Sequence, residues 1–254
     1  MNHLIREYYA GARLLDYGLW RFSRKHFRAE LRNGVFLKLN GPRRARLDAR
    51  DVQGIASRLA PMHLYMSVLD YLFPERVSGK DRTDCYPVGG ELLVDVDSYL
   101  FRRPHLHAFD NHHVCEGCLE ISRRLALEAA DEIGRYYTDM AVIFSGRRGF
   151  HIHVLDFQAR DWARPNPRNP FEFQAAARFK LLRLIEPTTH VFDHIHFTVS
   201  VDPLRVASVP GSVNGETGLV CSFVGSPSDL QRRSVVSILR ESAELMVAPI
   251  PYGR

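Results

Sequence analysis

Residues 140–157 read MAVIFSGRRGFHIHVLDF, and no other stretch says as much about the fold. Two apolar runs, 140–144 and 150–157, are rich in β-branched and aromatic residues and flank the short segment SGRRG. Such runs around a glycine-containing segment predict two strands joined in a hairpin. The turn is unusual because it contains a serine and two arginines, and a histidine follows at position 151.

A third strand is predicted upstream at 91–97, where the sequence is ELLVDVD. Its first half is apolar on both faces, as in a buried strand. Asp95 and Asp97 are two residues apart, so on a strand their carboxylates point to the same face. Neighbouring carboxylates repel unless a cation lies between them, and Mg²⁺ prefers oxygen ligands. The pair is therefore a candidate Mg²⁺ or Mn²⁺ site for phosphoryl or nucleotidyl transfer; the alternative is two solvated aspartates at a strand end.

The SGRRG turn is a candidate anion site. Adjacent arginines, together with a serine and a histidine, form a compact receptor for phosphate, and glycines let the backbone approach the ligand closely. A triphosphate is the expected ligand, beside metal held by the two aspartates. The alternative is a basic hairpin tip exposed to solvent. The residues concerned are Ser145, Arg147, Arg148 and His151.

Helices are predicted where apolar residues recur at helical spacing. These segments are 49–61, 115–137, 170–186 and 227–246, and residues 3–32 also show helix-like spacing of aromatic and basic side chains. A late strand is predicted at 219–224. Strands and helices interleave without strict alternation, so the predicted fold class is α+β, or mixed α/β. We expect a single catalytic domain over 1–254.

Composition narrows the class of protein. The chain has 254 residues, and 45% of them are hydrophobic, which excludes bulk disorder. Residues 1–50 contain 12 Lys+Arg and 4 Asp+Glu, so the excess positive charge lies there. Arginine outnumbers lysine, which suits a nucleotide or nucleic-acid binder and equally fits a GC-rich genome. No apolar run approaches the ~20 residues of a membrane helix, so we expect no membrane partner and a soluble, cytoplasmic protein.

Three segments now taken together resemble a known family. ELLVDVD (91–97), VCEGCLE (114–120) and FSGRRGFHIHVLDF (144–157) occur in the order seen in the catalytic small subunit of archaeal and eukaryotic DNA primases. Residues 61–74 and 199–219 extend the resemblance to about 60–225. The resemblance implies the archaeo-eukaryotic primase catalytic fold with a small zinc-binding appendage. It also implies primer synthesis for DNA replication and an archaeal source.

The resemblance also implies substrates, partners and residue roles. Short RNA or DNA primers would be made from nucleoside triphosphates on single-stranded DNA by a two-metal mechanism. The basic N-terminal segment would bind the template backbone or a primase large subunit. The implied catalytic residues are Asp95, Asp97 and His196, with Mg²⁺ or Mn²⁺ on the two aspartates. The implied nucleotide-binding residues are Ser145, Arg147, Arg148, His151, Ser212 and Asn214.

A second metal site is expected over residues 102–120, where four histidines precede a Cys-x-x-Cys pair. These residue types suit tetrahedral Zn²⁺, and the alternative is a surface histidine cluster without metal. The resemblance implies a structural zinc held by four of them, with His105 or His113 as substitutes for the first ligand. The implied ligands are His107, His112, Cys115 and Cys118. Cys85 and Cys221 are expected to be buried thiols.

The last motif, in residues 196–218, departs from the family pattern at three positions. His196 stands where the family has a metal-binding aspartate, Ser208 where it has a basic residue, and Asn214 where it has a histidine. A neutral imidazole brings no negative charge and favours softer ions than Mg²⁺, so Mn²⁺ is the better-tolerated metal. Three hypotheses stay open: a divergent, weak or Mn²⁺-dependent primase, an inactive primase-like protein that binds nucleotide or DNA, and a gap-filling primase-polymerase in repair.

Overall fold

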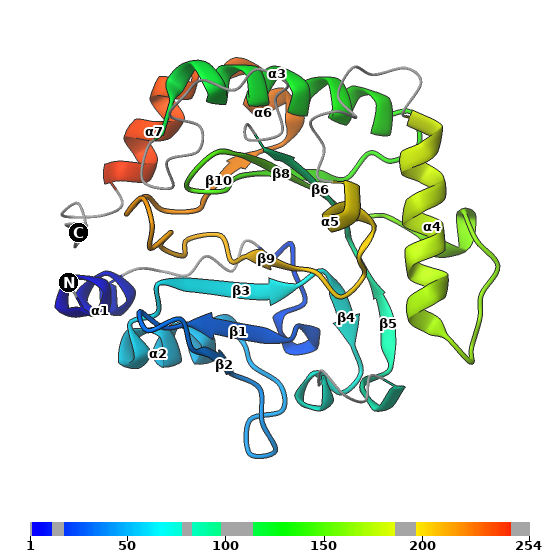
Figure 1. Ribbon diagram of the computed structural model, residues 1–254, viewed down its shortest axis with the longest axis horizontal. Helices are drawn as coiled ribbons and strands as arrows, with labels where there is room; N and C mark the ends of the chain where they lie inside the picture. Colours follow the sequence, from blue (N-terminus) through cyan, green and yellow to red (C-terminus); the bar gives the residue numbers. More distant parts are fainter. Residues whose placement is uncertain (1, 12–17, 78–82, 98–113, 186–196, 245–254) are drawn as a thin grey trace.

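The computed structural model describes residues 2–11, 18–77, 83–97, 114–185 and 197–244. Within these residues it contains two four-stranded sheets and one two-stranded ribbon, all antiparallel, with helices on their outer sides (Figure 1). The predicted α+β class is confirmed. None of the helices in the described ranges is long and apolar enough to cross a membrane.

The upper sheet of Figure 1 has the strand order β10-β7-β8-β6. β7 (Met140–Phe144) and β8 (Gly149–Val154) form the predicted hairpin, and β6 (Leu92–Asp97) pairs with β8. β10 (Ser222–Gly225) begins three residues later than expected. Two of the three segments that suggested the family therefore lie in one sheet, and the third, 114–120, begins the helix that packs on it.

Strand alternation divides this sheet into a core face and a second face. Leu92, Val94 and Val96 belong to a large apolar core with α3 (Glu116–Ile133), α4 (Pro170–Ile185), α6 (Pro227–Arg232) and α7 (Val235–Glu244). Figure 1 shows α3, α6 and α7 across the top of the sheet and α4 at its side. Because the side-chain period is two, Asp95 and Asp97 share one strand face, as predicted, and that face points away from this core.

The lower sheet has the order β2-β1-β3-β9. Its strands are β1 (Phe27–Glu30), β2 (Phe36–Lys38), β3 (His63–Ser67) and β9 (Val206–Ser208). One face packs on α1 (Asn2–Gly11), α2 (Ala49–Leu59) and Ile143 of β7, which ties the two sheets together. The other face is only half-buried. β4 (Leu69–Tyr71), β5 (Pro87–Gly90) and α5 (Phe197–Val201) complete the frame.

Two helix predictions are wrong in part. The helix-like spacing over 3–32 gives a helix only at its start, because the buried Phe27 and Ala29 alternate with half-buried neighbours and pair as β1 between β2 and β3. The helix predicted over 227–246 is interrupted after Arg232. Ser234 causes the restart, since its Oγ accepts a hydrogen bond from the Ser237 N–H at 3.1 Å and caps α7.

Candidate active site

A cleft of about 240 Å³ opens where β6 ends and β8 begins. It gathers side chains from both sheets and from the two loops around them. Seven of the residues that the sequence indicated line it: Asp95, Asp97, Ser145, Arg147, Arg148, His151 and Asn214. Five charged or aromatic residues of its lining were not proposed as site residues: Glu30, His63, Tyr65, Arg205 and Glu216.

The carboxylates occupy the strand next to the histidine. Asp95 pairs with His151 across β6 and β8, and the His151 Nε2 lies 3.4 Å from an Asp95 carboxylate oxygen. Burial lowers the pKa of His151 despite the opposing charge of Asp95, so the imidazole is neutral near pH 7. Its buried Nδ1 has no hydrogen-bond partner among the residues that the structure describes. In the neutral tautomer that carries its proton on Nδ1, this nitrogen can donate a hydrogen bond to an oxygen of a ligand in the cleft.

The turn between β7 and β8 is held rigidly, and both of its glycines are required. Gly146 has a φ of +78°, and a Cβ at Gly149 would lie 1.9 Å from the Val96 carbonyl oxygen. The Ser145 N–H donates to the Gly149 carbonyl at 3.0 Å, and the Gly149 N–H donates to Ser145 Oγ at 3.3 Å. These contacts fix the backbone that carries Arg147 and Arg148 into the cleft.

The opposite wall is the loop that follows β9. Asn214 Oδ1 accepts hydrogen bonds from the N–H groups of Glu216 (3.1 Å) and Thr217 (3.4 Å), and Thr217 Oγ1 donates to the Gly146 carbonyl at 2.6 Å. These bonds seat the loop on the arginine turn. The Glu216 carboxylate forms an ion pair with Arg147. The resemblance assigns both arginines to the triphosphate, but in this structure the guanidinium of Arg147 is already paired with an acidic side chain.

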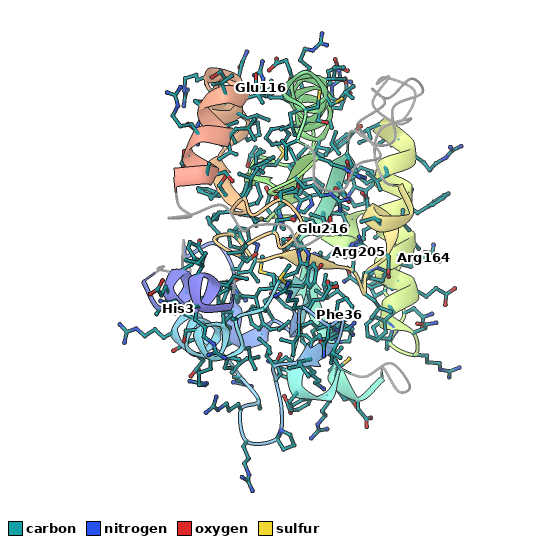
Figure 2. All side chains as sticks on the ribbon, turned by 60° about the vertical axis from the view of Figure 1, so that its left-hand side comes forward. His3, Phe36, Glu116, Arg164, Arg205 and Glu216 are labelled. Carbon is teal, nitrogen blue, oxygen red and sulfur yellow. The ribbon has the colours of Figure 1, made fainter. Side chains whose placement is uncertain are left out.

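Arg205 brings a positive charge to the part of the cleft where Ser208 has none. It lies three residues before Ser208, and both line the cleft. Its charge helps to lower the pKa of His151 and opposes the rise in the pKa of Tyr65, which burial causes. Figure 2 shows Arg205 and Glu216 together near the middle of the molecule. Arg205 fits the family motif, and that match was the signal that could have identified it.

Other predicted residues lie elsewhere. Ser212 is buried outside the cleft, and its Oγ donates to the Leu64 carbonyl at 3.5 Å. His196, His107 and His112 lie outside the described residues, as do His105 and His113. Of the predicted zinc ligands, Cys118 is buried in the main core and its N–H donates to Cys115 Sγ at 3.5 Å. The zinc-binding appendage is therefore not shown. Cys85 and Cys221 are buried thiols, as predicted.

The donor atoms in the cleft suit a hard divalent cation. Asp95 and Asp97 are half-buried on one strand face, and a carboxylate pair is the ligand type that Mg²⁺ and Mn²⁺ take. No set of three metal-ligating side chains occurs within the described ranges, and the third position of the family's metal site, residue 196, lies outside them. The residues present fit such a metal.

Volume alone does not identify the site. A larger cavity, of about 690 Å³, lies at the opposite end of β6, against Lys25, Asp70 and Glu91. The Lys25 ammonium forms close ion pairs with both carboxylates. The larger cavity also has arginines, but its carboxylates Asp70 and Glu91 are held by Lys25. The smaller cleft is the better candidate, because its carboxylate pair lies on one strand face beside the arginine turn.

Sequence comparison finds relatives over part of the chain. No family model matches it. The DNA primase small subunit PriS of Thermococcus onnurineus is 31% identical over 152 residues, which are 57% of this chain and 37% of that protein. PriS of Pyrobaculum arsenaticum is 26% identical over 195 residues, 63% of this chain and 59% of that protein. The matches thus cover less than two thirds of either relative's length.

Structural comparison covers nearly the whole chain. The polymerase domain from Mycobacterium tuberculosis ligase D, in complex with DNA, superposes with a TM-score of 0.56 at 14% identity. The match covers 96% of this chain and 89% of that domain. At this identity the likeness shows a shared fold. The resemblance indicated by the motifs is therefore confirmed: the chain is similar in sequence to DNA primase small subunits, and it shares a fold with the ligase D polymerase domain.

Proposed function

We propose that this protein is a template-directed nucleotidyltransferase that makes short RNA or DNA primers on single-stranded DNA. One observation carries the proposal: Asp95 and Asp97 share a cleft with Arg147 and Arg148. Carboxylates for metal beside arginines for phosphate are the parts that transfer of a nucleotide from a triphosphate requires. The similarity to primase small subunits supports primer synthesis as the outcome.

Each side chain has a proposed task in this reaction. Mg²⁺ or Mn²⁺ bound by Asp95 and Asp97 would promote loss of the proton from the attacking 3′-hydroxyl and neutralise phosphate charge. Arg147 and Arg148 hold the triphosphate and offset the charge that develops on it. The neutral His151 and the Ser145 hydroxyl position phosphate oxygens. The proposed third catalytic residue is His196.

Arg205 is proposed to take over the phosphate contact that Ser208 lacks. Replacement by glutamine (Arg205→Gln) is expected to weaken nucleoside triphosphate binding about tenfold to a hundredfold, because a hydrogen bond to a charged group is worth roughly 1.5–3 kcal/mol. The measurement is a calorimetric titration with triphosphate in the presence of Mn²⁺. Arg164→Gln, which removes an exposed arginine outside the cleft, is the matched control. Equal affinities of the two variants would refute this role.

Glu216 is expected to compete with the triphosphate for Arg147. Its carboxylate must leave the guanidinium before phosphate oxygens can take its place. Glu216→Gln removes the competing charge and should tighten triphosphate binding about twofold to fivefold, as expected for a partly exposed ion pair. Glu120→Gln, which breaks an ion pair on the outer helix α3, should leave the affinity unchanged. An affinity that falls or stays constant in Glu216→Gln would show that this carboxylate does not compete.

The competing proposal is a protein that binds nucleotide or DNA without catalysis. The ion pair of Arg147 with Glu216 and the uncharged Ser208 favour it. A third proposal, gap-filling synthesis in repair, shares the cleft chemistry.

One assay separates the three. Purified protein is incubated with single-stranded template and labelled NTPs or dNTPs, with Mg²⁺ or Mn²⁺, with and without a primer. New chains without primer support the primase, extension alone supports the repair polymerase, and binding without incorporation supports the binding protein.

Two further proposals concern zinc and a partner. We propose a structural Zn²⁺ held by His107, His112, Cys115 and Cys118, where four protein ligands would leave no position for a reactant. Metal analysis of the purified protein tests it, and a molar ratio near zero would refute it. A primase large subunit is the proposed protein partner, and co-purification with that subunit is the corresponding test.

A further inference from the structure

Three aromatic rings lie in a row on the half-buried face of the lower sheet. Phe36 comes from β2, and Tyr65 and His63 come from β3. Phe36 is 57% exposed, so much of its ring is accessible to a ligand. We call these three residues the ring platform.

The rings are nearly parallel and evenly spaced. The centroids of Phe36 and Tyr65 are 6.3 Å apart with an interplanar angle of 24°, and those of Tyr65 and His63 are 5.8 Å apart with an angle of 19°. Both separations lie within the range of stacked aromatic pairs. The Tyr65 hydroxyl donates to a Glu30 carboxylate oxygen at 3.2 Å, which holds the central ring in this orientation.

The ring platform leads into the candidate active site. His63 and Tyr65 line the cleft together with Asp95 and Arg147, whereas Phe36 lies on the edge strand. Figure 2 shows Phe36 in the lower part of the molecule, below Arg205 and Glu216. Arg28 pairs with Lys38 on one side and with Tyr65 on the other, so two positive charges belong to the same face as the rings. A strand of nucleic acid can thus contact rings with its bases and cations with its phosphates.

We propose that the ring platform binds unpaired bases of a single-stranded template by stacking and leads that strand to the cleft. The proposal rests on the proposed function, because it assigns the route of the template to that same site. Flat faces beside cations are the pattern of proteins that bind single strands without sequence preference. A protein partner would instead be expected to need a broader apolar patch than one strongly exposed phenylalanine with charged neighbours.

The experiment compares three replacements of Phe36 for binding of fluorescein-labelled oligothymidylate, measured by anisotropy. Phe36→Ala and Phe36→Leu should weaken binding about fivefold to 150-fold, because stacking of one base is worth roughly 1–3 kcal/mol. Phe36→Trp should bind at least as tightly as the wild type. Since Phe36 is exposed at an edge strand, these changes leave the core intact, and unchanged thermal unfolding verifies this. Phe179→Ala, which removes an exposed phenylalanine on α4, should bind like the wild type.

An abasic oligonucleotide of the same length isolates the contribution of the bases. The proposal predicts that wild type and Phe36→Ala bind this strand equally. It is overturned if Phe36→Ala binds oligothymidylate like the wild type, or if the loss persists on the abasic strand. It is also overturned if Phe36→Leu behaves as wild type, which would indicate docking of an apolar protein surface.

A failure of the ring-platform proposal can be distinguished from a failure of the proposed function. If the wild type incorporates nucleotide and Phe36→Ala binds DNA as tightly as the wild type, only the ring-platform proposal is rejected. Phe36-dependent binding without incorporation would reject only the catalytic proposal.

Discussion

Asp95→Asn is expected to reduce nucleotide incorporation at least about a thousandfold, with Mg²⁺ and Mn²⁺ alike. Asparagine has the shape of aspartate but no negative charge, so it binds a divalent cation beside the triphosphate much more weakly. The backbone contact is kept, since the residue's N–H still donates to Ser200 Oγ. The initial rate of template-directed extension at saturating nucleotide measures the effect.

Asp131→Asn is the matched control, because Asp131 is an exposed aspartate of α3 outside the cleft. It should incorporate nucleotide like the wild type, and both variants should unfold at the wild-type temperature. Incorporation by Asp95→Asn within about threefold of the wild-type rate would remove the carboxylate pair from the mechanism.

Lys25→Met should lower the free energy of unfolding by about 3–5 kcal/mol, the usual cost of breaking a buried ion pair. The Lys25 ammonium, only 1% exposed, lies 2.6 Å from a Glu91 carboxylate oxygen and 3.0 Å from one of Asp70. His153 Nδ1 lies 3.2 Å from the other Glu91 oxygen. Without the lysine, the buried carboxylate of Glu91 loses its main counter-charge. In a chain of this size the unfolding temperature should fall by about 6–20 °C.

The pH dependence of this effect identifies its electrostatic origin. Burial alone would raise the pKa of Glu91, but Lys25 and His153 more than reverse this and bring it to about 2. Because the folded value lies below the ordinary 4.5, the ion pair stabilises the fold fully above about pH 4.5. That contribution is lost as the pH falls towards 2.

Urea unfolding of the wild type and Lys25→Met at pH 7 and pH 3 measures this difference. The destabilisation should be smaller at pH 3, where Glu91 takes up a proton more readily in the variant. Lys180→Met, at an exposed lysine of α4, should not change stability at either pH. If Lys25→Met destabilises the protein equally at pH 7 and pH 3, the cause is lost packing and not a lost ion pair.

Much of the site could be predicted from local patterns. Side chains on a strand alternate between two faces, so Asp95 and Asp97, two residues apart, lie on the same face. The tight turn SGRRG fixes the pairing of β7 with β8. Once β6 lies beside β8, the carboxylates and the arginine turn must meet at the same end of the sheet. Two strands and one turn therefore determine the chemical centre of the cleft.

The remaining residues depend on contacts that local patterns do not encode. Tyr65 and Glu30 reach the cleft only because β1 and β3 pair in a particular register. Glu216 meets Arg147 through a loop packed on a distant turn, held by Thr217. A match to the family motif also does not guarantee a place in the cleft. Ser212 matches the motif, yet its side chain is buried against the Leu64 carbonyl. Residues 27–30 likewise form a strand despite helix-like spacing, because they pair with β2 and β3.

The most direct test of the central claim is a crystal structure with Mn²⁺ and a non-hydrolysable nucleoside triphosphate. The account predicts anomalous scattering from Mn²⁺ beside the carboxylates of Asp95 and Asp97. It also predicts the triphosphate on Arg147 and Arg148, with the Glu216 carboxylate displaced. A triphosphate bound in the larger cavity beside Lys25, or Mn²⁺ with no contact to either aspartate, would contradict it.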